Sequence, residues 1–371
     1  MNMARTRAAT TTPERPQGQS GNPENETTQA PPAARRKPDG ARPNQPPMFG
    51  GLSGSRRNVL DLDDFSKEEI EHILQSADGM NEVLSRDVRK TPTLRGKTIL
   101  TLFFENSTRT RVSFEQAGKV LGADVINVSA SASSVSKGES LLNTVRTLEA
   151  MKIDVLVMRH PHSGAPYYVA SKIDAAVVNA GDGTHAHPTQ SLLDLYTMRR
   201  HLGDIAGKKV TIIGDLHFSR VARSDVWGLR KMGAEVTVCG PPTLLPYGLR
   251  PGTEQAESAA FTGINVVDQV EEALEGADVV MALRIQRERQ DSGNLPDLRE
   301  YSKLYGINSD RLALASPGAL LMHPGPMNEG IEISSDVAHG AQAVIEEQVS
   351  NGVAIRMAVL YMLCARSRGG E

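Results

Sequence analysis

Cysteine is scarce in this sequence. Its 371 residues include two cysteines, Cys239 and Cys364, which lie far apart within apolar segments. No Cys-x-x-Cys pair is present, which excludes a zinc ribbon and a dithiol redox motif. We expect both thiols to be free and buried, as in proteins of a reducing cytosol.

The sequence also lacks a large net charge and a long apolar run. A net charge of −3 and a pI near 6.3 disfavour a general nucleic-acid binder, so no nucleic-acid partner is expected. No apolar run reaches the roughly 20 residues that span a bilayer. We therefore expect a soluble, cytoplasmic protein without membrane contact, long enough for two domains.

The first part of the chain differs in composition from the rest. Residues 1–56 are rich in Pro, Gly, Asn, Thr and Arg and contain few large apolar residues. Such a segment cannot bury enough apolar surface to fold, so we predict a disordered tail. It lacks the apolar core of a secretory signal, and three glutamates, at positions 14, 24 and 26, disfavour an organelle transit peptide.

From about Val59 onward, short apolar runs alternate with helical patterns. The spacing of Ser66 and Glu69 predicts a capping box, and a long helical pattern runs from about Ala341 to Cys364. Runs rich in Val, Ile or Leu without alternation predict parallel strands buried on both faces. They cover residues 98–104, 124–128, 154–159, 175–180, 208–214, 234–239, 278–284 and 319–323. We predict an α/β fold: two domains, each with a mostly parallel sheet flanked by helices, closed by a C-terminal helix.

Polar and basic segments repeatedly follow the predicted strands. Ligands of open parallel sheets bind at the carboxyl ends of the strands, so we expect these segments to form one cleft between two domains. The segments are residues 107–111, 159–161, 187–190, 215–220, 284–289 and 323–326.

The run at residues 103–111, Phe-Phe-Glu-Asn-Ser-Thr-Arg-Thr-Arg, is the most informative of these segments. It joins a strand to a helix, where free backbone N–H groups and the helix dipole favour an anion. Three hydroxyl groups and the guanidinium of Arg109 add phosphate donors. A plain N-cap would explain Ser107, but cations at a helix N-terminus oppose the dipole. We predict a phosphate site.

This run resembles the Ser-Thr-Arg-Thr turn with which the aspartate/ornithine carbamoyltransferase family binds carbamoyl phosphate, and the resemblance covers roughly residues 59–366. It implies a carbamoyl-phosphate-binding domain at 57–188, completed by 345–367, and an aspartate-binding domain at 189–344. It implies no cofactor. The carbamoyl phosphate ligands carried over are Ser107, Thr108, Arg109, Thr110, Arg159, His187, Gln190, Pro324 and Gly325.

Three of these residues are implied to be catalytic: Thr110, Arg159 and His187. Arg159 ends a predicted strand, where an arginine could also be a surface cap; the resemblance gives it a contact to carbamoyl phosphate. His185 and His187 are spaced as in some metal sites, but no ligand cluster completes one, so we predict no metal. A helix cap is a further reading of His187. The resemblance implies that His187 binds the carbamoyl oxygen and Gln190 the carbamoyl amide, and leaves His185 without a role.

The polar stretch at residues 133–139 is typical of a solvated loop. It also resembles the family's mobile loop, which enters the active site of the neighbouring subunit. On that resemblance Ser133 and Lys137 bind phosphate from the neighbouring chain, and Lys137 also lies near the amino-acid substrate. A homotrimer with shared active sites is then the smallest active unit.

The acceptor site is expected in the second domain. Two convergent arginines suit a dicarboxylate, since each carboxylate takes a bidentate pair, although both could be ordinary loop caps. The resemblance assigns aspartate binding to Arg220, Arg284 and Gln286, besides Lys137. It assigns domain closure to Glu105 and Arg289, in an ion-pair network with Arg220.

The segment His323-Pro324-Gly325-Pro326 separates the two main types within the family. Ornithine-type members have a His-Cys-Leu-Pro run here, whereas this chain has no cysteine at that place. The resemblance therefore implies carbamoyl transfer to the α-amine of L-aspartate, giving N-carbamoyl-L-aspartate and phosphate in de novo pyrimidine (UMP) biosynthesis. Two alternatives stay open: another acceptor amine such as ornithine, and a non-catalytic scaffold subunit. A larger assembly with regulatory chains or dihydroorotase is compatible with the sequence.

Overall fold

A computed structural model of the chain describes residues 56–129, 139–249, 261–286, 289 and 297–365. All of them belong to one compact unit spanning residues 45–371. The predicted tail at 1–56, apart from its last residue, lies outside the described residues, as do Ser133 and Lys137.

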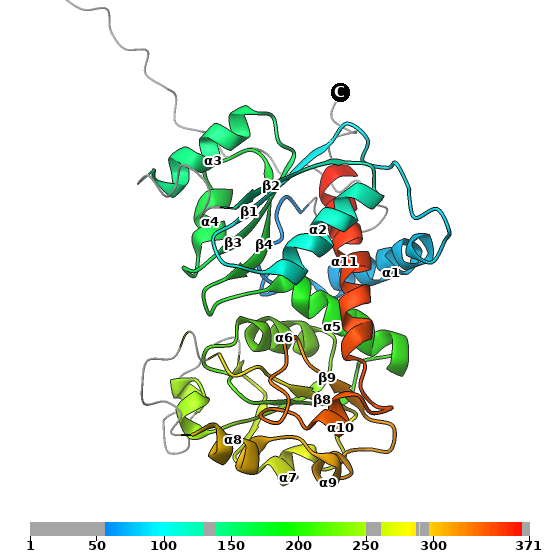
Figure 1. Cartoon of the computed structure of the whole chain (residues 1–371), viewed down its shortest axis with the longest axis vertical. Coiled ribbons are helices and arrows are strands. Elements are labelled where there is room, and N and C mark those ends of the chain that lie inside the picture. Colours follow the sequence, from blue (N-terminus) through cyan, green and yellow to red (C-terminus); the bar gives the residue numbers. More distant parts are fainter. Residues whose placement is uncertain (1–55, 130–138, 250–260, 287–288, 290–296, 366–371) are drawn as a thin grey trace, which may run out of the picture. The chain divides into compact units, whose positions relative to one another are not determined.

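Two parallel sheets organise the described chain (Figure 1). The first has the order β2-β1-β3-β4, and the second has the order β7-β6-β5-β8-β9. The strands are β1 (Thr98–Phe103), β2 (Asp124–Ser129), β3 (Val155–His160), β4 (Ala176–Asp182), β5 (Lys209–Ile213), β6 (Glu235–Cys239), β7 (Asn265–Val267), β8 (Val279–Ala282) and β9 (Leu320–Met322). Every predicted strand is present, and the predicted fold class is confirmed.

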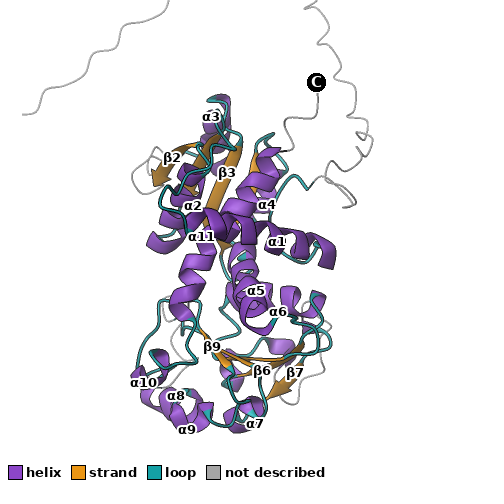
Figure 2. Ribbon diagram, turned by 90° about the vertical axis from the view of Figure 1, so that its right-hand side faces the viewer, coloured by secondary structure: helices purple, strands orange, loops and turns teal. Residues whose placement is uncertain are grey.

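Along the chain most α-helices alternate with the strands, and Figure 2 shows them packed around the sheets. They are α1 (Lys67–Leu84), α2 (Thr108–Val120), α3 (Leu141–Ala150), α4 (Ala165–Ala170), α5 (Pro188–Leu202), α6 (Arg220–Lys231), α7 (Val270–Leu274), α8 (Leu298–Tyr305), α9 (Ser309–Leu312), α10 (Ser335–Ala338) and α11 (Ile345–Ala365). Short 3-10 turns cover Pro242–Leu244 and Tyr247–Leu249. The predicted capping box is present, because Ser66 and Glu69 exchange side-chain and backbone hydrogen bonds at the start of α1.

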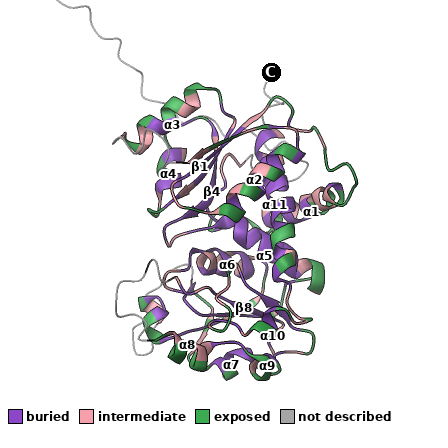
Figure 3. Ribbon diagram, in the orientation of Figure 1, coloured by how far each residue is buried: buried purple, intermediate pink, exposed green. Residues whose placement is uncertain are grey.

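The strands and the inner faces of the helices form the core (Figure 3). β1 is buried from Ile99 to Phe103, and β8 is buried throughout. One prediction needs correction, and one strand was missed. β2 is not buried on both faces, because it lies at the edge of its sheet and most of its residues are exposed or half-buried. The edge strand β7 was not predicted, because its three residues are too few to show a pattern.

Helix α11 connects the two halves of the unit. It packs against α1, α2 and α5 and also reaches β9. In the described part of the chain it alone is long and apolar enough to cross a membrane, against the expectation from the sequence that no such run exists. However, 72% of its most apolar 18-residue stretch is buried inside the protein. Burial of this kind is typical of a core helix, and α11 brings polar side chains from its buried surface to the site described next.

Candidate active site

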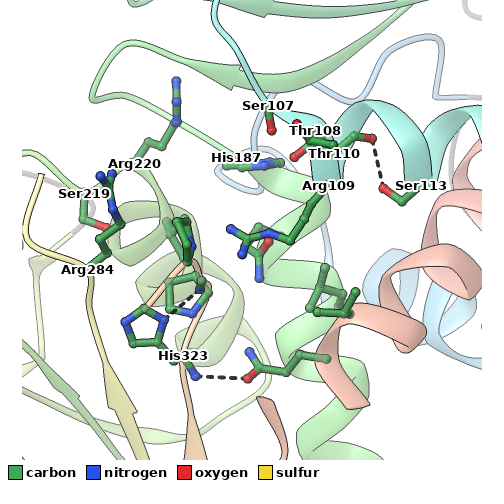
Figure 4. A pocket seen from close by; sticks show the side chains of 18 of the residues that line it. Ser107, Thr108, Arg109, Thr110, Ser113, His187, Ser219, Arg220, Arg284 and His323 are labelled. Carbon is green, nitrogen blue, oxygen red and sulfur yellow. Dashed lines mark hydrogen bonds between the residues drawn. The ribbon is translucent and has the colours of Figure 1, made fainter. Parts of the chain in front are cut away.

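A cavity of about 730 Å³ lies at the carboxyl ends of the strands (Figure 4). All six predicted polar segments contribute to its lining, which confirms that the sequence pattern marks one cleft. The predicted site residues that line it are Ser107, Thr108, Arg109, Thr110, Arg159, His187, Gln190, Arg220, Arg284, Gln286, Arg289, Pro324 and Gly325. Glu105 does not line the cavity, but it bonds to arginines that do.

The N-terminus of α2 forms one wall of the cavity. Ser107 is its N-cap residue with an extended backbone, yet its side chain makes no capping hydrogen bond. Capping therefore does not account for Ser107, and that alternative is wrong. The first turn of α2 contains no acidic residue, so its backbone N–H groups and the side chains of Thr108 and Thr110 are available to an anion.

The cavity is strongly cationic. Among the described lining residues there are six arginines and no aspartate or glutamate. The arginines are Arg109, Arg159, Arg220, Arg284, Arg289 and Arg356. Burial lowers the pKa of Arg159 to about 9, with a further contribution from the charge of Arg220. Burial, and then the charge of Arg284, also lowers the pKa of Arg109. Both groups stay charged at neutral pH, so the cavity favours ligands with several negative charges.

Glu105 partly balances three of these arginines from behind the wall. Its Oε2 accepts a hydrogen bond from Nη2 of Arg220 at 2.6 Å and lies 3.2 Å from Nε of Arg159. Its Oε1 lies 3.7 Å from Nη2 of Arg289. Gly181 leaves room for this packing: its φ is +116°, and a Cβ there would lie 3.0 Å from Nε of Arg220. The predicted grouping of Glu105, Arg220 and Arg289 is therefore present in the structure.

Figure 4 shows Ser107, Arg109 and His187 on one side of the pocket, with Ser219, Arg220 and Arg284 on the other. His187 is buried, and burial, followed by the charge of Arg159, lowers its pKa well below the usual range. Its imidazole is therefore neutral at neutral pH. Its backbone N–H donates to Oγ of Ser224 at 2.9 Å, which ties the start of α5 to α6.

The two histidines considered for a metal lie in different surroundings. His187 lines the cavity, whereas Nδ1 of His185 lies 3.2 Å from Oδ2 of Asp182, which is buried and outside the cavity lining. That hydrogen bond raises the pKa of His185. Among the described residues, no group of three His, Cys, Asp or Glu side chains is arranged to hold a metal ion.

Sequence reasoning missed several lining residues, most notably two on α11. Gln348 and Arg356 are both nearly fully buried, and their helix is apolar on almost every side. Arg356 packs its guanidinium over the ring of Phe114, 5.2 Å from the centroid. Burial lowers its pKa to about 10, and Asp194 opposes this shift. A charged side chain in the middle of an apolar helix was the signal that could have identified this residue.

Comparisons with known proteins agree with this architecture. Residues 57–200 match the family model of the aspartate/ornithine carbamoyltransferase carbamoyl-P binding domain, and residues 206–363 match that of the Asp/Orn binding domain. The aspartate carbamoyltransferase catalytic subunit of Roseiflexus sp. (strain RS-1) is 56% identical over 318 residues, covering 86% of this chain and 98% of that protein.

Solved structures of carbamoyltransferases share the fold of this chain. Aspartate transcarbamoylase from Trypanosoma cruzi in complex with carbamoyl phosphate and aspartate aligns with a TM-score of 0.73 at 32% identity, covering 83% of this chain and 96% of that chain. Ornithine carbamoyltransferase from Pyrococcus furiosus aligns with a TM-score of 0.72 at 27% identity, covering 85% of this chain and 98% of that chain. Because both types share the fold, the fold alone does not select the acceptor.

Proposed function

The chain belongs to the aspartate/ornithine carbamoyltransferase family, and we propose that the arginine-lined cavity is where it transfers the carbamoyl group of carbamoyl phosphate to L-aspartate. The activity is that of its relatives at 55–56% identity, carbamoyl transfer to aspartate in pyrimidine synthesis. The observation that carries the assignment of the site is the lining itself: a helix N-terminus and six arginines, without a lining carboxylate among the described residues.

The phosphate group binds at the start of α2 in this proposal. Ser107, Thr108 and Thr110 supply hydroxyl and backbone donors, and Arg109 supplies its guanidinium fork. The absence of a capping bond at Ser107 supports this role, because the hydroxyl needs no reorganisation before it meets the ligand.

The carbamoyl carbonyl lies between Thr110, Arg159 and His187, the three residues we assign to catalysis. The aspartate amine attacks the carbamoyl carbon, and negative charge develops on the carbonyl oxygen of the tetrahedral intermediate. Arg159 stabilises that charge with a fixed guanidinium, and neutral His187 does so as a hydrogen-bond donor. The intermediate then collapses with release of phosphate.

The proton of the attacking amine also needs an acceptor. No carboxylate lines the cavity among the described residues, and the lowered pKa values of His187 and His323 make both rings weak bases. The departing phosphate is the proton acceptor in our scheme. Catalysis then rests on the positioning of two anionic substrates and on electrostatic stabilisation.

The two carboxylates of aspartate bind opposite α2, at Arg220, Arg284 and Gln286. Nη1 of Arg284 donates to Oε1 of Gln286 at 3.3 Å, so the two side chains already lie together. Glu105 and Arg289 hold Arg220 in place and serve domain closure. The side-chain ammonium group of an acceptor such as ornithine would meet like charge here and no lining carboxylate among the described residues, which favours aspartate.

The assembly and the domain division are further parts of the proposal. We infer a homotrimer in the cytoplasm, in which Ser133 and Lys137 of a neighbouring chain complete each site; both residues lie outside the described part of the chain. Regulatory chains or dihydroorotase could join a larger complex. The domains are residues 57–188 with 345–367, and 189–344, a division supported by the two separate sheets.

Replacing Arg109 tests the site assignment. Arg109→Ala removes a charged hydrogen-bond donor from the phosphate, so we expect carbamoyl-aspartate formation to fall at least about 100-fold with the fold unchanged. Arg111→Ala is the matched control, because Arg111 lies on the same helix and does not line the cavity. Equal activity of the two variants would refute the assignment.

A further inference from the structure

A chain of side-chain hydrogen bonds runs behind the cavity from α5 to the turn after β9. Its centre is the carboxylate of Asp194, which is 1% exposed. Nε2 of Gln190 donates to Oδ1 of Asp194 at 3.1 Å, and Nε2 of Gln348 donates to the same oxygen at 2.7 Å. At the far end, Oε1 of Gln348 accepts the backbone N–H of His323 at 3.0 Å.

The carboxylate gives this chain a direction. Oδ1 of Asp194 accepts both hydrogen bonds, so both glutamines turn their NH2 groups toward Asp194. The oxygen of Gln348 is occupied by His323. The oxygen of Gln190 accepts no hydrogen bond from the described residues, and Gln190 lines the cavity. The free end of the chain is therefore a hydrogen-bond acceptor beside the ligand.

The same chain supports a second pair of acceptors. Gln348 holds the backbone of His323, and Nδ1 of His323 in turn accepts the backbone N–H of Gly325 at 2.8 Å. The carbonyl groups of Pro324 and Gly325 belong to this turn, which lines the cavity. The acceptors on α5 and on the turn after β9 are thus connected through one buried carboxylate.

We propose that Asp194 is a positioning residue that makes the site selective for an acyl phosphate carrying an NH2 group over one carrying a methyl group. It fixes the oxygen of Gln190 toward the cavity and, through Gln348, steadies the turn that offers further acceptors. A methyl group would leave these acceptors without a partner, which costs roughly 10- to 100-fold in affinity. This inference rests on the proposed function.

The substitution Asp194→Leu tests the inference because leucine has a similar branched shape and accepts no hydrogen bond. Gln348 stays as it is, because His323 requires its oxygen. Gln190 then has no acceptor for its NH2 group, so its oxygen is no longer fixed toward the ligand. In full-length protein without aspartate, we expect carbamoyl phosphate to bind about 3- to 10-fold more weakly, the cost of ordering one freed side chain. Affinities for acetyl phosphate and inorganic phosphate should not change.

Three further variants separate orientation from general damage. Gln190→Ala should lower the preference for carbamoyl over acetyl phosphate, and adding Asp194→Leu to it should lower the preference no further, because the two act through one group. Asp225→Leu is the matched control. Asp225 is an equally buried carboxylate on α6 that makes no hydrogen bond to Gln190, so the preference should stay as in the unmodified protein.

Several outcomes would overturn the inference. One is an equal loss of affinity for all three ligands in Asp194→Leu; another is no change at all. If that variant does not fold, hydrogen exchange of the Gln190 side-chain NH2 group, measured by NMR in the unmodified protein, is the test. We expect slow exchange; fast exchange would contradict the inference. An unmodified protein that binds phosphate without binding carbamoyl phosphate would overturn the proposed function as well, a result distinct from failure of the variant.

Discussion

Glu105 is the residue whose replacement tests the electrostatics of the site most sharply. Its carboxylate faces Arg159, Arg220 and Arg289 from behind the cavity wall. Glu105→Gln keeps the shape of the side chain and removes the one negative charge. The guanidinium groups of Arg159 and Arg220 would then repel each other without compensation, in a place where burial already lowers the pKa of Arg159.

The magnitude follows from burial. The side chain of Arg220 is 4% exposed and that of Glu105 is 22% exposed, so the pair is mostly but not fully shielded from water. Removing one partner of a fully buried ion pair costs about 3–5 kcal/mol. Glutamine keeps an oxygen acceptor, and Glu105 is partly exposed, so we expect a loss of about 2 kcal/mol in the free energy of unfolding.

Urea unfolding with and without phosphate measures this effect. In the proposed site, phosphate binds the folded state and supplies negative charge near the same arginines, so we expect the stability difference between Glu105→Gln and the unmodified protein to shrink as phosphate is added. Glu115→Gln is a suitable control, since Glu115 forms an exposed pair with Lys119 on α2 and its replacement should cost at most about 0.5 kcal/mol. The reasoning would be refuted if Glu105→Gln were as stable as the unmodified protein. It would also be refuted if the difference in stability between the two proteins did not change with phosphate.

Two further predictions concern a close contact and a buried acid. In Gly325→Ala, the φ of +60° strains alanine, and the new Cβ would lie 2.5 Å from Nη1 of Arg109 and displace it. Calorimetry should show about 1–2 kcal/mol lost in stability and carbamoyl phosphate affinity reduced about tenfold; unchanged affinity would contradict the contact. Burial raises the pKa of Asp61 to about 6, although the hydroxyl of Ser224 donates to it. The unfolded state loses this proton near pH 4, before the folded state does, so folding stability falls as the pH rises from 4 to 6. Asp61→Asn should therefore be more stable than the unmodified protein at pH 8, by up to about 3 kcal/mol. At pH 4 it should have no advantage in stability.

The sequence predicted local structure well because local structure depends on neighbours along the chain. Ser66 and Glu69 formed the expected capping box, and the run after β1 started α2 as expected. The exposure of β2 could not be predicted, because strand order within a sheet is set by long-range pairing, which leaves no local signal.

The site was predictable to the extent that its residues follow strands. Six such segments met in one cavity because parallel strands align their carboxyl ends. Gln348 and Arg356 were missed because α11 is distant in sequence and mostly apolar. The roles of Glu105 and Arg289 came from resemblance to a family, since nothing in their local sequence indicates which partners a folded chain brings to them.

The most direct test of the central claim is product formation from carbamoyl phosphate, with aspartate and ornithine assayed in parallel, using purified protein treated with a chelator. We predict N-carbamoyl-L-aspartate and phosphate in equal amounts, without added metal, and no reaction with ornithine. Product from ornithine alone would mean that Arg220 and Arg284 do not bind an acceptor dicarboxylate. No product from either amine would contradict the assignment of this cavity as a carbamoyl-transfer site.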